Sequence, residues 1–199
     1  RIRQPGDDRK TCLTTVLGHA LRQKFVPLAR AALHHGADPN AAASLVGINH
    51  TERAPVAACA SQINAEERPG LLRVLLAHGW DPALRFDADR SFLGWTVRGG
   101  RVDDLETVAL ARPDIDWDAV DRRPGASSDR TLLASLPFLG GAENGLLKEA
   151  LVRTAHWLLD HGANPLQASV PDRTALLLKA IDWEEGGLLE RLAIPGMPT

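Results

Sequence analysis

Histidine is the residue type in this chain that could most readily do chemistry, because three copies occupy one recurring position. His35, His78 and His161 each directly precede a glycine. A metal ion or an acid–base site would need these imidazoles to converge with other ligands. Equivalent positions on stacked helices lie roughly 10 Å apart, too far to share one ion. We therefore expect structural histidines near helix C-termini, where a basic side chain suits the helix dipole, and we predict no metal site.

Other catalytic patterns are missing from the sequence. It contains no Gly-x-Ser-x-Gly and no phosphate-binding Gly-Lys-Ser/Thr loop. An acid-rich segment lacks the twelve-residue loop of a calcium site and is interpreted as a solvated face. Its members are Asp103, Asp104, Glu106, Asp114, Asp116, Asp118 and Asp121. We expect no enzyme, no cofactor and no small-molecule substrate; the alternative is a hydrolase or modifying enzyme with a site at Asp121 or His50.

Composition limits the partners and the compartment. The 199 residues carry a net charge of −2 and are 44% hydrophobic, which suits a soluble protein with a continuous core. This weak charge does not favour nucleic acid, and no apolar run approaches the roughly 18–20 residues that span a bilayer. Cys12 and Cys59 are expected to be reduced and buried in helices, which favours the cytoplasm. A secreted or periplasmic location stays open because the chain starts at Arg1 rather than Met.

The elements that must position these residues are revealed by internal repetition. One phrase, rich in leucine and containing His-Gly before Asp-Pro or Asn-Pro, occurs at 33–40, 75–82 and 158–165. A weaker copy at 110–116 has Arg112 in the glycine position, 33 residues after Gly79 (112 − 79). A second phrase, which begins with a basic residue, opens each unit at 10–13, 53–56, 90–93, 130–133 and 173–176. A period of 33 residues is typical of the ankyrin repeat.

The two phrases resemble the ankyrin family, whose repeats open with basic-Thr-Pro-Leu-His and close with Leu-Leu-x-x-Gly-Ala-Asp-x-Asn. No unit keeps the Thr-Pro-Leu-His string intact. The resemblance implies an all-α solenoid of stacked helix-turn-helix units with connecting hairpin loops. It also implies a single domain over 1–199, with approximate units 8–40, 41–83, 84–117, 118–166 and 167–199. The polar residues Glu184, Glu185, Glu190 and Arg191 are interpreted as a C-terminal cap.

Local signals agree with two helices per unit. Leucines at 71, 72, 75 and 76 form an apolar stripe at helical spacing. Gly36, Gly79 and Gly162 are predicted to end helices in a left-handed conformation, and Pro27 and Pro69 to lie in first turns. Extra length is expected in the hairpins at 44–51 and 122–128, and between paired helices at 64–70 and 140–145. These insertions are either loops on a binding face or neutral variation.

The resemblance also implies a recognition surface formed by hairpin tips and the exposed side of each first helix. Exposed positions are expected at Ala88, Ala168, Val170 and Pro171, among others. Phe86 and Trp117 are candidate interface anchors or locally packed side chains, whereas Phe92, Trp95 and Trp157 are expected in the core. The predicted partner-binding residues are Arg53, Arg85, Phe86, Asp87, Arg90, Arg98, Trp117, Asp121, Arg122, Arg130, Val170 and Arg173.

A basic residue recurs at the opening of every unit and adds a second hypothesis. The five are Lys10, Arg53, Arg90, Arg130 and Arg173. They are either a ladder that captures partner carboxylates or family consensus with weak local ion pairs.

The sequence therefore predicts a non-catalytic module that binds a dedicated protein partner. Its composition is similar to that of small bacterial ankyrin proteins, which include immunity proteins that neutralise a cognate toxin. The alternative function is an effector or scaffold segment of a longer protein that engages host or cellular proteins.

Overall fold

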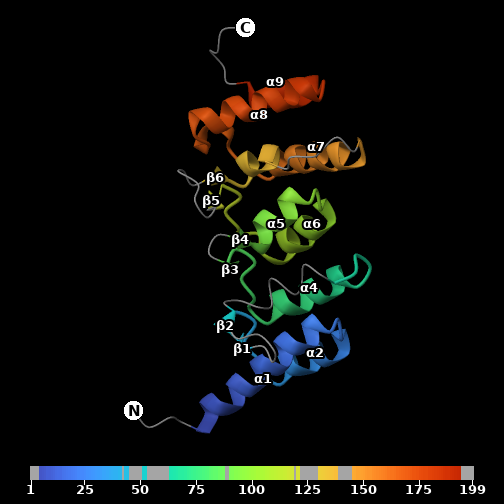
Figure 1. Cartoon of the computed structure of the whole chain (residues 1–199), viewed down its shortest axis with the longest axis vertical. Helices are drawn as coiled ribbons and strands as arrows, with labels where there is room; N and C mark the ends of the chain where they lie inside the picture. Colours follow the sequence, from blue (N-terminus) through green and yellow to red (C-terminus); the bar gives the residue numbers. More distant parts are fainter. Residues whose placement is uncertain are drawn as a thin grey trace. The chain divides into compact units, whose positions relative to one another are not determined.

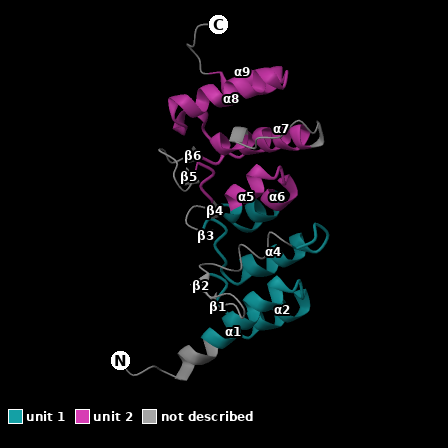
Figure 2. Cartoon of the chain, in the orientation of Figure 1, with its two compact units in different colours: residues 1–92, 106–113 teal, residues 93–105, 114–199 magenta. Residues whose placement is uncertain are grey.

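The computed structural model describes residues 5–41, 43–44, 51–52, 63–87, 90–118, 120–121, 130–138 and 145–193. It divides into two compact units, shown in different colours in Figure 2. Unit 1 comprises Arg1–Phe92 and Glu106–Pro113, and unit 2 comprises Leu93–Leu105 and Asp114–Thr199. The single domain over 1–199 stays a prediction.

Paired helices alternate with short antiparallel hairpins in both units (Figure 1). The helices that begin in unit 1 are α1 (Pro5–Arg22), α2 (Val26–His34), α4 (Arg68–Ala77) and α5 (Phe92–Arg98), and its strands are β1 (Ala43–Ser44), β2 (Thr51–Glu52), β3 (Arg85–Asp87) and β4 (Arg90–Ser91). The elements that begin in unit 2 are α6 (Val102–Ala111), β5 (Val120–Asp121), β6 (Arg130–Thr131), the 3-10 helix η1 (Leu133–Phe138), α7 (Gly145–Asp160), the 3-10 helix η2 (Pro165–Gln167), α8 (Val170–Asp182) and α9 (Gly186–Leu192).

Three helices end at glycines in the left-handed conformation, as predicted. Gly36, Gly79 and Gly162 have φ values of +94°, +80° and +93°. In each turn the next residue donates its amide to the carbonyl five residues earlier, at 3.0 Å. This is the longer of the two bonds of the Schellman motif, which satisfies carbonyls that the helix leaves open. The glycine positions are therefore fixed by backbone geometry.

The tight turns between paired helices use the same bond at three further corners. Gly100 has φ +66°, and the amide of Arg101 donates to the carbonyl of Thr96 at 3.1 Å. Lys24 and Glu184 hold the equivalent corners with φ values of +58° and +59°. A side chain at such a φ costs roughly 1–2 kcal/mol, so these two corners carry strain that glycine would avoid.

The apolar stripes predicted from the leucines form the core. Leu71, Leu72, Leu75 and Leu76 on α4 are all buried. Pro27 and Pro69 lie in the first turns of α2 and α4, where the missing N–H costs nothing. None of the described helices combines the length and the apolar character needed to cross a bilayer.

The stretch before α8 differs from the predicted hairpin. Residues 163–169 contain η2 and no strand, and Ser169 caps α8 by accepting a hydrogen bond from the amide of Asp172. Because this cap starts the helix at Val170, no residues are left to form a hairpin. Ala168, expected to be exposed, is buried. The prediction for this loop was therefore wrong.

Other local expectations were also wrong. Arg68, Pro69 and Gly70 belong to α4, so only residues 64–67 of the expected insertion lie outside that helix. The opening of the fourth unit is the 3-10 helix η1, which contains Pro137; the missing N–H of proline disfavours an α-helix there.

Cys12 was expected to be buried but is exposed on α1, on a different side from the buried residues of that helix such as Leu17. Asp104 is buried in the first turn of α6, where the helix dipole favours its charge.

Candidate functional site

Half of the predicted binding residues lie in the described strands of the hairpins. In unit 1 both hairpins lie on the same side of the helices, at the left of Figure 1. In β3–β4, Asp87 pairs with Arg90 across the hairpin. In β5–β6, Asp121 pairs with Arg130. In both hairpins the register therefore sets an acidic residue opposite a basic one.

The predicted site residues fall into three groups. Backbone positions in hairpin strands are described for Arg85, Phe86, Asp87, Arg90, Asp121 and Arg130. Arg53 and Arg122 lie outside the described residues, as do Cys59 and Ala88. The same holds for residues 45–50 of the insertion expected at 44–51, for the whole of 122–128, and for residues 140–144 of the insertion expected at 140–145.

The third group has described side chains. Arg98 ends α5 and is half-buried, while Val170 and Arg173 lie on the first turn of α8. Val170 is exposed and Arg173 is half-buried, with a buried Nε that has no hydrogen-bond partner in the described part of the chain. The structure establishes the accessibility of these three predicted binding residues and of Trp117.

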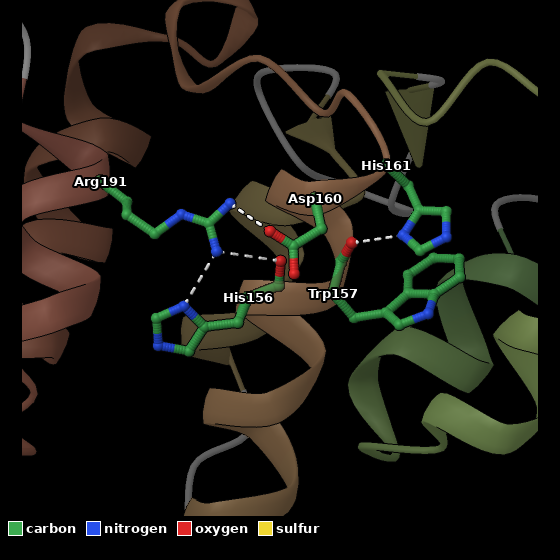
Figure 3. Close-up of polar contacts among 5 residues, drawn as sticks. All are labelled: His156, Trp157, Asp160, His161 and Arg191. Carbon is green, nitrogen blue, oxygen red and sulfur yellow. Dashed lines mark hydrogen bonds and ion pairs between the residues drawn. The ribbon is translucent and has the colours of Figure 1, made fainter.

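Trp117 is a core residue and not an exposed anchor. Its side chain is 8% exposed and packs edge-on against Trp157, with ring centroids 4.8 Å apart. Trp157 in turn stacks on His161 at 3.7 Å (Figure 3). His161 donates Nδ1–H to the carbonyl oxygen of Trp157 at 2.8 Å, so this imidazole closes the end of α7. The alternative of local packing therefore holds for Trp117.

Trp80, Phe92 and Trp95 also make local ring contacts. Trp80 is fully buried and meets Phe92 edge-on at 5.0 Å, so Phe92 lies in the core as predicted. Trp95 is only partly buried, contrary to expectation, and the guanidinium of Arg101 lies 3.8 Å from the centre of its ring. A cation held over an indole stabilises the α5–α6 turn.

Side chains of the closing phrase link successive turns. The amide group of Asn40 donates to the carbonyl of Gly79 at 2.7 Å and accepts from the amide of Asp81 at 2.8 Å. In unit 2, Asp118 accepts a hydrogen bond from the backbone amide of Asn164 at 2.7 Å. These polar residues therefore join one turn to the next, and Asp118 serves the fold in a segment that was interpreted as a solvated face.

The cap residue Arg191 makes the contacts drawn in Figure 3. Its Nη2 donates to Asp160 at 2.7 Å, and its Nη1 contacts His156 Nδ1 at 3.1 Å. Asp160 and His156 belong to α7. Arg191 therefore ties α9 back to the preceding helix, which leaves it unavailable as a free charge.

Within the described ranges no three His, Cys, Asp or Glu side chains are grouped so that they could hold a metal ion. Sequence reasoning did miss one surface: α8 exposes Leu178 and Ile181 as well as Val170. Val170 and Leu178 are eight residues apart, and Leu178 and Ile181 are three apart. Both spacings place residues on the same side of a helix, so this pattern could have identified them.

Structural comparison relates the chain to ankyrin proteins. No protein-family model matches the sequence, and no curated protein matches it. An ankyrin repeat domain from Acinetobacter baumannii AYE is similar, with a TM-score of 0.61 and 21% identity over 87% of this chain and 76% of that one. Another ankyrin repeat protein has a TM-score of 0.60 and 19% identity over 88% of this chain and 78% of the other. The chain therefore has the ankyrin-repeat fold, which confirms the predicted fold class and the resemblance at the level of fold.

Proposed function

We propose that this chain is a non-catalytic module that binds a dedicated protein partner. The ankyrin-repeat fold is the observation that supports the proposal most, because stacked repeats present extended surfaces that suit protein recognition. The exposed Val170 adds an apolar group of the kind found in protein interfaces, and the half-buried Arg98 adds a charged one.

The proposed contact surface is built around the hairpin β3–β4. It carries Arg85, Phe86, Asp87 and Arg90, which supply an aromatic and two guanidinium groups within six residues (90 − 85 + 1). Aromatic and arginine side chains contribute most of the binding energy in typical interfaces. Trp117 is left out of this surface because it is buried.

The test is affinity purification of the natural full-length protein from its own cells, followed by mass spectrometry of bound proteins. A Phe86→Ala/Arg90→Ala variant is expected to lose a stoichiometric partner. Phe25→Ala is the matched control, because Phe25 is 54% exposed in unit 1 and belongs to no hairpin. Retention of the partner by the hairpin variant would contradict the proposed surface, and the absence of any partner would contradict the function.

A finer proposal is that the partner is a toxin and this chain its immunity protein. Neutralisation of a toxin requires tight binding, so isothermal titration calorimetry with the purified partner is expected to give a nanomolar Kd. An affinity of micromolar or weaker, or a partner encoded far from this gene, would reject the toxin–immunity relationship while leaving the binding module intact.

A further inference from the structure

Two exposed arginines occupy equivalent positions on neighbouring helices of unit 1. Arg30 on α2 lies six residues before Gly36 (36 − 30), and Arg73 on α4 lies six residues before Gly79 (79 − 73). α2 contacts α4 (Figure 1), and equivalent positions on packed helices are roughly 10 Å apart. We call Arg30 and Arg73 the arginine pair.

The side chain of Arg30 is turned towards α4. Its Nη2 atom lies 3.3 Å from the position that a Cβ atom would take at Gly70. Gly70 is in the first turn of α4, three residues before Arg73, so the guanidinium lies over the helix that carries the second arginine. Glycine is less favourable than alanine inside a helix, and here it leaves the room that the guanidinium needs. Arg30 therefore reaches from one repeat onto the next.

This arrangement gathers positive charge without a paired carboxylate. Arg30 lies at the N-terminal end of α4, where the helix dipole is itself positive and disfavours a cation. Neither α2 nor α4 contains an aspartate or a glutamate. Within the described ranges the side chains of the arginine pair make no hydrogen bond or ion pair, and neither do those of Glu66 and Glu67, which directly precede α4. The guanidinium groups therefore keep unused donors that suit an anionic group.

The next equivalent position carries the opposite charge. Glu106 on α6 is exposed and lies six residues before Arg112, which takes the glycine position (112 − 106). This part of α6 belongs to unit 1, together with α2 and α4. The three equivalent positions are therefore positive, positive and negative. The uniformly charged phosphates of a nucleic acid would be repelled at Glu106, whereas an acidic run in a protein can stop before it.

We propose that the arginine pair binds an acidic segment of a protein, with one carboxylate on each guanidinium. The planar fork of arginine donates two parallel hydrogen bonds to a single carboxylate. In an extended segment the carboxylates of alternate residues lie about 7 Å apart, within reach of two long side chains on neighbouring helices. This surface does not include the β3–β4 hairpin, so it is a second contact surface and does not depend on the proposed function.

Microscale thermophoresis with a fluorescein-labelled acidic peptide tests the proposal. The probe alternates glutamate with alanine and contains six glutamates in about 12 residues, which gives an extended length of about 40 Å. Exposed charge pairs are individually weak, so the 199-residue chain should bind it at low salt with a Kd of roughly 0.1–1 mM. Arg30→Gln/Arg73→Gln should bind at least about tenfold more weakly, with the circular dichroism of the parent.

A matched double variant controls for net charge. Arg22→Gln/Arg153→Gln removes the same charge from two exposed arginines outside the pair, on α1 and α7. It should bind the peptide like the parent. An equal loss in the two double variants would show that net charge alone attracts the peptide and would overturn the proposal. Failure of the parent to bind the peptide would overturn it as well.

Two further measurements test the charge pattern. Glu106→Lys extends the positive row and should strengthen peptide binding about three- to tenfold, and an unchanged affinity would contradict the row. A single-stranded oligonucleotide with six phosphates matches the charge of the peptide, and the parent should bind it more weakly because of Glu106. Tighter binding of the oligonucleotide than of the peptide would mean that the pair recognises nucleic acid and would overturn the assignment to a protein.

Discussion

The side chain of Asn40 is a small group on which two turns of unit 1 depend. It donates to the carbonyl of Gly79 and accepts from the amide of Asp81, so one amide satisfies two backbone groups. Asn40→Ala removes both bonds. A hydrogen bond contributes roughly 0.5–1.5 kcal/mol net, and Asn40 is half-exposed, so the expected loss in the free energy of unfolding is about 1.5–2 kcal/mol.

Asn40→Asp separates the two bonds. A carboxylate still accepts from the amide of Asp81, but it cannot donate to the carbonyl of Gly79. The expected loss is about 1 kcal/mol, between those of the parent and Asn40→Ala. Asn64→Ala is the matched control, because Asn64 is exposed and its side chain makes no hydrogen bond within the described part of the chain.

Urea unfolding measures these differences by circular dichroism and by tryptophan fluorescence, to which the buried Trp80 beside Gly79 contributes. Asn40→Ala should lower the transition midpoint with an unchanged slope, since the same surface is exposed on unfolding. If Asn40→Ala and Asn64→Ala unfold within about 0.5 kcal/mol of each other, the link between the turns adds no stability and the reasoning is refuted.

Three further predictions concern unit 2. Gly100→Ala would place a Cβ 2.7 Å from that of Ala150 at φ +66°, and should cost more than about 3 kcal/mol in chemical unfolding. Gly162→Ala meets open space at φ +93°, so its loss should stay near 1–2 kcal/mol; equal losses would contradict the steric argument. Trp117→Ala should cost about 3–5 kcal/mol in thermal unfolding, and a change below about 1 kcal/mol would contradict its role in the core. Arg191→Ala removes an exposed ion pair with Asp160 and should cost under about 1 kcal/mol, whereas a larger loss would mean that the pair behaves as a buried one.

The sequence predicted features that depend on neighbouring residues. The glycine corners and the leucine stripe of α4 follow from backbone preference and helical period, which a window of ten residues contains. The start of α8 also had a local signal, because Ser169 followed three residues later by Asp172 is a capping pattern that was not used.

Features that depend on distant residues were not predicted. Trp117 is covered by Trp157, which lies 40 residues later (157 − 117), and no local pattern reveals that contact. Exposure is likewise a tertiary property, so Cys12 and Asp104 were placed on the wrong sides of their helices. The hairpin arginines could be proposed as site residues only through the resemblance. Their role depends on the residues opposite them in the hairpin and on any partner that binds there, and neither follows from a local pattern.

The corner turns of this chain share one backbone geometry. Glycine, lysine and glutamate all occupy it, yet the backbone bond to the carbonyl five residues earlier is the same at each. A segment that is excised at one corner turn and inserted at another therefore meets the same backbone geometry at both ends. Gene duplication and recombination can therefore lengthen, shorten or shuffle such a chain by whole repeats, while the surface carried by each repeat diverges independently.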